Sequence, residues 1–372
     1  MKFDSEEMLA GIRAWVLVES PTYHREGVNR MMDLAEKEMA DRGAQIERIP
    51  GKEGFGDTVK ARLPSEHSGP GILILSHLDT VHPVGTLDSI LPYRREGDRI
   101  YGPGTYDMKG GAYMACYVLR QIFAEGGSLN LPVTFMFIPD EEVGSPTTRG
   151  LIEAEAGNNK FVLVTEPAKN GKLVTGRYAF ARFTLTAKGK PSHAGSTLSR
   201  GRSAIREMAQ QILRIEEMTD EAKGYTLSVG VISGGTFVNT VPIHCEAQVL
   251  AVMQSQGLFD ELRQRMVNLQ SINPEVKFIV TPGPVRPMFE PDGNVIALYE
   301  TAEKIAREIG FVPGHGTFGG GSDGNFTGAM GIPTLDGLGV CGDGAHTHSE
   351  YMLYSSLEPR ARLMAGLLKT LR

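Results

Sequence analysis

Three short apolar runs in this chain each lead directly into side chains that can bind a metal ion. They are residues 72–79 (ILILSHLD), 133–142 (VTFMFIPDEE) and 161–166 (FVLVTE). Continuous apolar runs of about four to eight residues predict strands that are buried on both faces, as in a parallel sheet covered by helices. The sequence therefore predicts an α/β protein with helices on both sides of its main sheet.

In open sheets of this kind, ligands bind outside the carboxyl ends of the strands. Two further stretches, residues 106–109 (YDMK) and 344–350 (GAHTHSE), supply another carboxylate and more histidines. Histidines and carboxylates that meet at one sheet edge predict a metal site. The side chains expected to converge there from three different strands are His77 with Asp79, Glu141 with Glu142, and Glu166.

The pattern of elements changes twice along the 372 residues, a length sufficient for two or more domains. Up to about residue 173, strand-like runs alternate with helical stretches, which indicates a parallel α/β sheet. The following residues, to about 281, have the order strand, helix, strand, strand, helix, strand of a ferredoxin-like module. After Pro287 the α/β pattern resumes. We therefore expect one domain of residues 1–175 and 287–372, with residues 176–286 inserted as an α+β domain.

The sequence also predicts the bounds of two elements near the C-terminal end of the chain and the buried face of one helix. A strand is expected over residues 333–338, before a closing helix over residues 357–371. A helix in the inserted module is expected to turn one apolar face to its core. That face consists of Ile205, Met208, Ala209, Ile212 and Leu213.

Composition and charge exclude several classes of partner. The formal charge of -6 is spread over the sequence without a long basic block, which argues against nucleic acid or an anionic membrane as the main partner. The first residues (MKFDSEEMLAGIRAW) are too acidic for a signal peptide, and no apolar run approaches a membrane span. The three cysteines lie far apart without a CxxC pair, which favours reduced thiols. These features predict a cytoplasmic protein.

The spacing of the candidate side chains suits metal chemistry. His77 and Asp79 are two apart on an extended segment, so Asp79 can accept a hydrogen bond from the ring nitrogen that faces away from the metal. Asp107 follows a glycine-rich approach, and its two carboxylate oxygens could bridge two ions. Glu141 and Glu142 are adjacent and point apart, so one can bind metal while the other acts as a base. Paired ions typically lie roughly 3.5 to 4 Å apart and activate water while they clamp the reacting oxygen.

Each of these groups has an ordinary explanation when taken alone. Two neighbouring glutamates are usually a solvated surface, and a lone histidine near a strand end is usually a loop residue. Their coincidence favours the metal site, because every group follows a buried-strand or glycine-turn pattern and together they supply ligands and a base.

Six motifs, SHLDTV, YGPGTYDMKGG, IPDEEVGS, TEP, GKPSHAG and GAHTHSEY, resemble those of a dinuclear zinc family. This family includes glutamate carboxypeptidase, acetylornithine deacetylase, succinyl-diaminopimelate desuccinylase and aminoacylase. The resemblance spans almost the whole chain in the same order. It implies a zinc-peptidase-like mixed sheet covered by helices and an inserted lid through which the protein forms a homodimer. It also implies two Zn2+ ions, for which Co2+ can substitute, and a cis peptide between Asp107 and Met108.

The resemblance also implies a role for each matching residue. Asp79 would support the ligands, Glu141 would be the general base, and His193 would polarise the scissile carbonyl, often from the lid of the partner subunit. His348 competes with His346 for the last ligand position, and the glycine approach GDGA favours His346. The metal ligands that it implies are His77, Asp107 as the bridge, Glu142, Glu166 and His346.

The nearest branch resembles the glutamate carboxypeptidase type, on the segments GKPSHAG, VNTVP and GGGSDGNF. This likeness implies four residues that contact the substrate: Asn239, Arg286, Gly320 and Ser322. The glycine-rich turn that contains Gly320 and Ser322 would bind a substrate carboxylate through its backbone N–H donors. The alternative for that turn is a plain flexible loop, and no buried strand feeds it as a dinucleotide fingerprint would require. This chain has Val252 where the branch carries an arginine, which argues against strict glutamate specificity.

These observations predict a zinc-dependent hydrolase that cleaves an amide bond next to a free carboxylate, in a small peptide or an N-acyl amino acid. A carboxypeptidase of the glutamate carboxypeptidase type is preferred, and an N-acyl amino acid deacylase of the acetylornithine deacetylase type is the alternative. A metal-free homologue that binds an amino acid or acts as a scaffold is a third possibility. The intact ligand set argues against it, because buried carboxylates without a counter-charge are costly.

Overall fold

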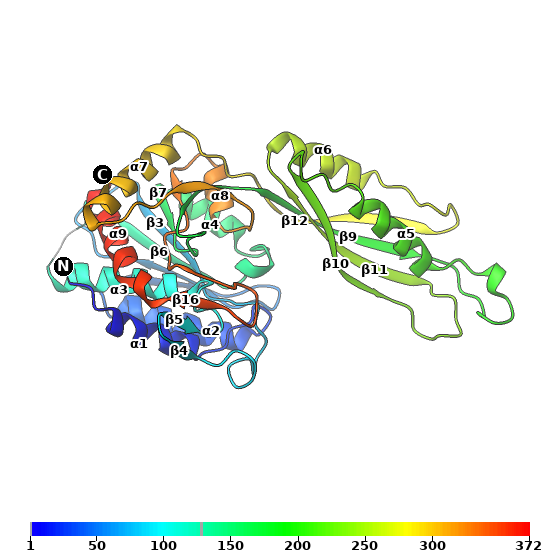
Figure 1. Cartoon of the computed structure of the whole chain (residues 1–372), viewed down its shortest axis with the longest axis horizontal. Helices are drawn as coiled ribbons and strands as arrows, with labels where there is room; N and C mark the ends of the chain where they lie inside the picture. Colours follow the sequence, from blue (N-terminus) through cyan, green and yellow to red (C-terminus); the bar gives the residue numbers. More distant parts are fainter. Residues whose placement is uncertain (1, 127–128) are drawn as a thin grey trace. The chain divides into compact units, whose positions relative to one another are not determined.

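The computed structural model describes residues 2–126 and 129–372, and the chain divides into two compact units. The first unit runs to Arg177 and resumes at Phe289, and the second unit is formed by Tyr178–Met288. The sequence predicts these divisions after residues 175 and 286. Figure 1 colours the second unit green to yellow; in the sequence, its residues come between the two stretches that build the first unit.

A six-stranded sheet in the order β1-β2-β6-β3-β7-β14 forms the centre of the first unit (Figure 1). Strands β6, β3, β7 and β14 are parallel, whereas β2 is antiparallel to β6 and β1 is antiparallel to β2. All residues of β3 and β6 are buried, which confirms a mixed sheet with strands covered on both faces. The strands are β1 (Gln45–Ile49), β2 (Thr58–Arg62), β3 (Gly71–His77), β6 (Val133–Ile138), β7 (Asn159–Val164) and β14 (Thr334–Leu335).

Alternate side chains of the central strands enter two separate apolar cores. Ile72 and Ile74 belong to the core that α1, α2, α3, α7 and α9 complete. Leu73 and Leu75 pack on the opposite face with α4 and α8. The predicted α/β architecture is therefore confirmed. The helices are α1 (Ser5–Val16), α2 (Arg25–Ala40), α3 (Lys109–Ala124), α4 (Arg149–Ala156), α7 (Gly293–Ile309), α8 (Gly324–Ala329) and α9 (Leu357–Thr370).

Two smaller sheets position the loops of the first unit. One is antiparallel, in the order β15-β16-β5-β4, and the other is the parallel pair β13-β8. Because β16 pairs with β5, the loop that follows β5 and the loop that precedes β16 lie side by side. The strands are β4 (Arg94–Glu96), β5 (Arg99–Tyr101), β8 (Leu173–Arg177), β13 (His315–Phe318), β15 (Gly342–Asp343) and β16 (Tyr351–Leu353).

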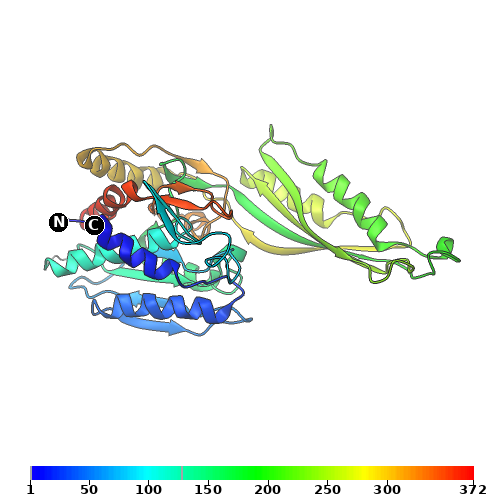
Figure 2. The ribbon, with the colours of Figure 1, turned by 60° about the horizontal axis from the view of Figure 1, so that its bottom comes forward.

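The second unit is a four-stranded antiparallel sheet in the order β10-β11-β9-β12. This order, with the chain sequence β9-α5-β10-β11-α6-β12, is the ferredoxin-like arrangement that the sequence predicts. Both helices pack into one apolar core on the same face of the sheet (Figure 2). The elements are β9 (Ala179–Lys188), α5 (Ala204–Glu216), β10 (Tyr225–Gly234), β11 (His244–Met253), α6 (Gln256–Val267) and β12 (Lys277–Arg286).

The apolar face predicted for α5 is only partly correct. Met208 is buried in the core of the second unit and Ile212 packs against it. Ile205 and Leu213, however, are 40% and 63% exposed, and Ala209 between them is exposed as well. The helix therefore carries apolar residues on two sides. The spacing of apolar residues shows that a helix has an apolar side, but it does not show whether that side packs against the core of the same chain or remains exposed.

The strand predicted over residues 333–338 is shorter than expected. Only Thr334 and Leu335 pair with β7. The chain then turns, because Gly337 adopts a positive φ of 70° and Asp336 uses its carboxylate to bind the neighbouring guanidinium of Arg177. The residues expected to form the end of the strand therefore form a turn, in which Asp336 makes a buried ion pair.

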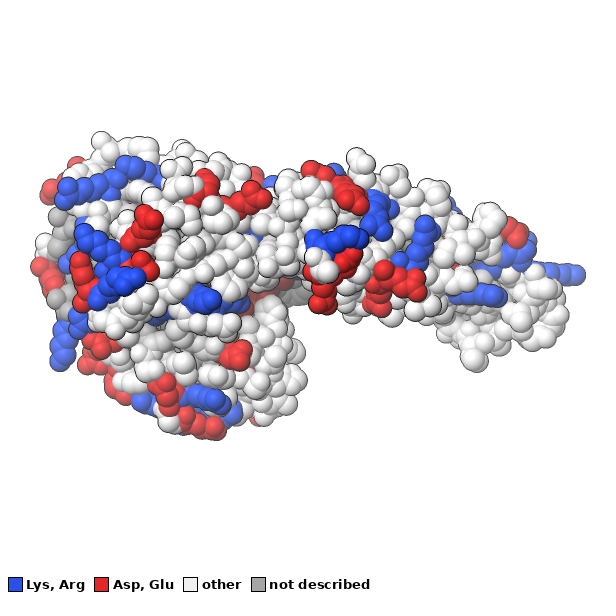
Figure 3. All heavy atoms as spheres, turned by 45° about the horizontal axis from the view of Figure 1, so that its top comes forward, with Lys and Arg blue, Asp and Glu red and all other residues white. Residues whose placement is uncertain are grey.

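Charged side chains of both signs are interspersed over the face of the molecule that Figure 3 shows. Within residues 2–126 and 129–372, no helix combines the length and the apolar character needed to span a bilayer.

Two adjacent glycines at the start of α3 let this helix approach the sheet closely. A Cβ atom at Gly110 would overlap the carbonyl oxygen of Thr105, and one at Gly111 would overlap that of Thr165, just beyond β7. The helix begins two residues after Asp107, so this close approach fixes the position of a candidate metal ligand. The motif MKGG is thus explained by packing.

We expect Gly111→Ala to lower the free energy of unfolding by roughly 1 to 3 kcal/mol, because the backbone of Thr165 cannot move away easily. Gly150→Ala is the matched control, since no heavy atom lies within 4 Å of a Cβ at that position of α4. That substitution should be neutral or stabilising by up to about 1 kcal/mol. Urea unfolding of both variants measures the difference. Equal effects of the two substitutions would contradict the packing argument.

Candidate metal centre

Three of the predicted ligands meet at the carboxyl end of the central strands. His77 is the last residue of β3, Glu166 follows β7, and Asp107 lies in the loop before α3. The Nε2 atom of His77 is 3.2 Å from Oδ1 of Asp107 and 3.6 Å from Oε1 of Glu166. One ligand atom from each of these residues can be chosen so that all lie within 4.8 Å of one another.

A second group of three ligands shares Asp107 with the first. Nε2 of His346 is 3.4 Å from Oδ2 of Asp107 and 3.0 Å from Oε2 of Glu142. Glu142 lies in a short 3-10 helix after β6, and His346 lies in the loop between β15 and β16. The two oxygens of Asp107 therefore face two different histidines, and His348 is exposed in the same loop.

The donor set fits divalent metal ions. Two ligands about 2.1 Å from one ion in tetrahedral geometry are about 3.4 Å apart, which agrees with the distances between these ligand atoms. Imidazole nitrogens and carboxylate oxygens are donors that zinc accepts. The peptide between Asp107 and Met108 is cis, as the resemblance implies.

The buried carboxylates of the cluster are also stabilised by nearby positive charge. Burial, together with the charge of Asp107, raises the pKa of Glu142 to about 8 and that of Glu166 well above its ordinary value. Burial opposes ionisation of Asp107 too, but hydrogen bonds with His346 and His77 hold its pKa well below the ordinary value. Hydrogen bonds with Asp107 and Glu142 raise the pKa of His346 to about 11. The carboxylates repel one another and are stabilised by the nearby cations, an environment that metal ions would also satisfy.

Glu141 is buried beside the first group of ligands but is not one of them. Its Oε2 atom is 4.0 Å from Nε2 of His77, whereas its neighbour Glu142 contacts His346 at 3.0 Å. Both glutamates lie in the 3-10 helix and not on an extended strand. The two side chains contact different histidines, and only Glu142 belongs to a three-residue group of the described residues.

Asp79 supports the site in more ways than the sequence predicts. The Nδ1 atom of His77 lies 3.0 Å from the backbone oxygen of Asp79 and 3.4 Å from its carboxylate. The carboxylate also accepts from the backbone N–H groups of Glu141 and Glu142 and from the hydroxyl of Thr22. Asp79 therefore fixes the turn that carries both glutamates while its backbone orients His77.

Glu350 belongs to the motif GAHTHSEY, but the sequence did not predict its role, which is to fix Asp107. Glu350 is buried and accepts hydrogen bonds from the backbone N–H groups of Gly104, Tyr106 and Asp107. Its Oε2 atom is also 2.7 Å from Nε2 of His82, a histidine to which the sequence assigned no partner. The glutamate in GAHTHSEY was the available signal, because an acidic residue so close to a ligand histidine often has a supporting role.

A buried ion pair between Arg177 and Asp336 is hydrogen-bonded to the glycine-rich turn that contains Gly320. Arg177 donates from Nε to Asp336 at 2.6 Å and from Nη1 to the carbonyl oxygen of Gly320 at 2.9 Å. Ser322 is fully buried, and its hydroxyl donates to Asp336 at 2.6 Å and accepts from the N–H of Gly324. Ser322 thus links elements of the fold, which argues against a hydroxyl contact with substrate. The N–H of Gly320 has no acceptor within the described residues, so it is available to a ligand.

The remaining predicted residues belong to the second unit. Nδ1 of His193 accepts the backbone N–H groups of Gly195 and Ser196, at 3.1 and 3.2 Å. The proton of a neutral His193 must therefore be on Nε2, which makes the exposed ring a donor. Asn239 lies beside this loop, since its carbonyl accepts from the N–H of Ala194. Arg286 is buried at the end of β12.

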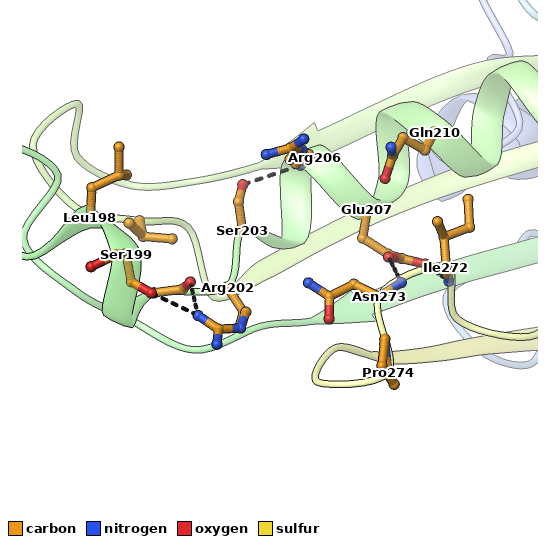
Figure 4. A pocket seen from close by; sticks show the side chains of 12 residues that line it. Leu198, Ser199, Arg202, Ser203, Arg206, Glu207, Gln210, Ile272, Asn273 and Pro274 are labelled. Carbon is orange, nitrogen blue, oxygen red and sulfur yellow. Dashed lines mark hydrogen bonds between the residues drawn. The ribbon is translucent and has the colours of Figure 1, made fainter.

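A cavity of about 740 Å3 in the second unit contains none of the candidate ligands (Figure 4). It lies between the start of α5 and the loop around Asn273. Its acidic residue, Glu207, accepts the backbone N–H groups of Ile272 and Asn273, and its Arg202 pairs with Glu275. Glu207 and Arg202 are thus used within the fold, and the cavity contains neither a candidate ligand nor a candidate base, so the chemistry is expected at the metal centre.

Comparisons with known proteins assign the family. The chain matches peptidase family M20/M25/M40 over residues 73–370. It is 30% identical over 366 residues to carboxypeptidase G2 of Pseudomonas sp. (strain RS-16), which covers 96% of this chain and 87% of that protein. An M20 family metallo-carboxypeptidase of Sulfolobus solfataricus shares the fold with a TM-score of 0.73 and 17% identity, over 99% of each chain. A dinuclear metal binding peptidase of Bacillus subtilis shares it with a TM-score of 0.68 and 14% identity, over 98% of this chain and 97% of that one.

The chain therefore belongs to peptidase family M20/M25/M40 and is a metallopeptidase, a hydrolase. The family resemblance that the sequence motifs indicate is confirmed.

Glu350→Gln should weaken metal binding by roughly 10- to 100-fold, the usual cost of removing a residue that supports a ligand. The amide keeps the size of the side chain but loses the charge that holds three backbone N–H groups around Asp107. Glu358→Gln is the control, because Glu358 is half-exposed and pairs with Arg362 on α9, away from the candidate ligands. Competition with a chelator measures affinity for zinc, and circular dichroism checks the fold. Unchanged affinity in a folded Glu350→Gln protein would refute the supporting role.

Proposed function

We propose that this metallopeptidase uses two zinc ions to cleave an amide bond next to a free carboxylate, as a carboxypeptidase. The observation that carries the proposal is the pair of ligand groups that share Asp107. His77, Asp107 and Glu166 would hold one ion, and Asp107, Glu142 and His346 would hold the other. The two ions, when bound, would polarise the scissile carbonyl and activate the attacking water.

Glu141 is proposed to move the proton during the reaction. It is buried next to His77 and lies outside both ligand groups of the described residues, which supports a role in accepting a proton from the attacking water. It would then give the proton to the nitrogen of the leaving group, since one carboxyl group can act as base and then as acid. Asp79 keeps Glu141 in place through the backbone hydrogen bond at 3.2 Å.

His193 is proposed to stabilise the oxygen of the scissile carbonyl. Because the N–H groups of Gly195 and Ser196 occupy its Nδ1 atom, the neutral ring offers Nε2–H as a donor without a change of tautomer. A donor fixed before the reaction stabilises negative charge as it develops on that oxygen.

Substrate recognition is proposed to involve the free carboxylate of the substrate. The N–H of Gly320, Asn239 and the guanidinium of Arg286 are the candidate contacts, whereas Ser322 is engaged inside the fold. The likeness to carboxypeptidase G2 supports a carboxypeptidase. Val252, in place of the arginine of that branch, favours a broader preference than glutamate alone and leaves an N-acyl amino acid deacylase as the second candidate.

Exchanging each glutamate for glutamine separates the base from the ligand. Glu141→Gln should keep both ions and lose roughly 10²- to 10⁴-fold in turnover, because only proton transfer is removed. Glu142→Gln should lose one ion, with activity that excess zinc partly restores. Metal content and turnover of a panel of N-blocked dipeptides and N-acyl amino acids test both variants and the proposed activity. If Glu141→Gln loses an ion while Glu142→Gln keeps two, the roles must be exchanged.

The protein is further proposed to form a homodimer through the second unit. β10 is at the edge of its sheet, and Val231 and Ile232 on it are 53% and 54% exposed. Ile205 and Leu213 add exposed apolar surface on α5. An uncovered strand edge with apolar side chains is a surface that a second copy can cover.

If His193 serves the site of the partner subunit, two inactive variants should complement each other. A mixture of His193→Ala and Glu141→Gln chains should recover about one quarter of wild-type activity, because half of the dimers are mixed and each mixed dimer has one intact site. Subunit exchange is verified by mass spectrometry of the mixed dimers. The absence of recovery in dimers that do exchange would rule out delivery between subunits.

A further inference from the structure

A cavity of about 380 Å3 opens next to the metal centre in the first unit. Both chain neighbours of His346 line it, as does Tyr106, the residue before Asp107. The cavity is therefore adjacent to the loops that carry His346 and Asp107. The residues of the cavity that matter here are Tyr106, Lys169, Phe318, Asp343, Ala345 and Thr347.

Lys169 is held in the wall of this cavity by a tight turn. The backbone N–H and C=O groups of Lys169 and Lys172 are bonded to each other, at 3.1 and 3.0 Å. Asn170 and Gly171 between them have φ values of 53° and 75°, the conformation of a two-residue hairpin loop. The preceding residue, Ala168, donates to Val340 and accepts from the hydroxyl of Tyr106. The position of Lys169 is thus fixed from both sides.

Lys169 is also a positive charge without an assigned partner. Lys109 and Arg177, which lie near the ligands, are buried and bonded to the carbonyl of Val18 and to Asp336. Lys169 is only half-buried and forms no ion pair within the described residues. Asp343 on the cavity wall accepts the N–H of Gly344 and is exposed, so water screens its charge more strongly.

We propose that this cavity binds a carboxylate-bearing group of the substrate, next to the scissile amide, and that Lys169 determines this preference. The inference rests on the proposed function and specifies its substrate class: acidic groups are preferred over neutral groups of the same size. Asp343 opposes the preference, because its charge has the same sign as the substrate group. The two residues therefore tune the selectivity in opposite directions.

The test uses pairs of substrates that differ by one charge. N-acetyl-glutamyl-alanine is compared with N-acetyl-glutaminyl-alanine, and N-acetyl-alanyl-glutamate with N-acetyl-alanyl-glutamine, so that either side of the scissile bond can show the effect. Lys169→Met should lower the acidic-to-neutral ratio of kcat/KM by roughly 3- to 10-fold in one pair, the range of a partly exposed ion pair. Lys169→Glu should lower it further, and Asp343→Asn should raise it.

Lys172→Met is the matched control, because Lys172 shares the same turn but does not line the cavity. Affinities of the four peptides are also measured on the zinc-loaded Glu141→Gln protein, with and without Lys169→Met. This binding readout does not need turnover. A Lys169-dependent affinity for the acidic member without hydrolysis by the wild type would overturn the proposed activity and support the inference. A ratio that changes equally with Lys172→Met, or with neither variant, would overturn the inference about Lys169.

Discussion

The structure depends on how Asp107 is held. Its two oxygens face the histidines of both ligand groups, and its own N–H is tied to Glu350. The carboxylates around Asp107 repel one another when they are ionised. Without hydrogen bonds to hold them, the loops that carry these carboxylates would separate. Glu350 supplies an acceptor for three backbone N–H groups, and the two glycines of α3 set the helix against the sheet. The first unit can therefore present acidic groups at one edge without collapse of the loops that carry them.

The sequence predicted the parts of the site that follow from strand ends. Apolar runs located β3, β6 and β7, at whose carboxyl ends lie three of the five candidate ligands, His77, Glu142 and Glu166. What it could not supply are hydrogen bonds between segments distant in the chain. The carboxylate of Asp79 also binds the turn of Glu141, Glu350 holds Asp107, and Arg177 binds Asp336. Such contacts arise from tertiary packing, which carries no periodic pattern. The exposed side of α5 was missed for a related reason, since apolar spacing does not show what covers a surface.

The two units present their functional groups in different ways. Of the candidate ligands in the first unit, His77 and Glu166 are buried at strand ends of the covered sheet, Asp107 and Glu142 are half-buried, and His346 is exposed on a loop. His193 in the second unit is exposed on a loop, with only its tautomer fixed by neighbouring N–H groups. A rigid element suits groups whose spacing must match an ion, whereas an exposed donor suits a contact made only when substrate arrives. The proposed dimer would cover the apolar residues of β10 and α5.

The bond between Glu350 and Asp107 joins residues that are 243 positions apart, with the whole second unit synthesised between them. During translation, the segments that carry His77, Glu142 and Glu166 emerge before those that carry His346 and Glu350. Closing so long a loop costs entropy before any contact rewards it. The acidic loops of the first unit therefore lack this support until the segment that carries Glu350 has been made. Of the two candidate ligand groups, the one that contains His346 is likewise complete only after that segment, whereas His77, Asp107 and Glu166 all precede the second unit.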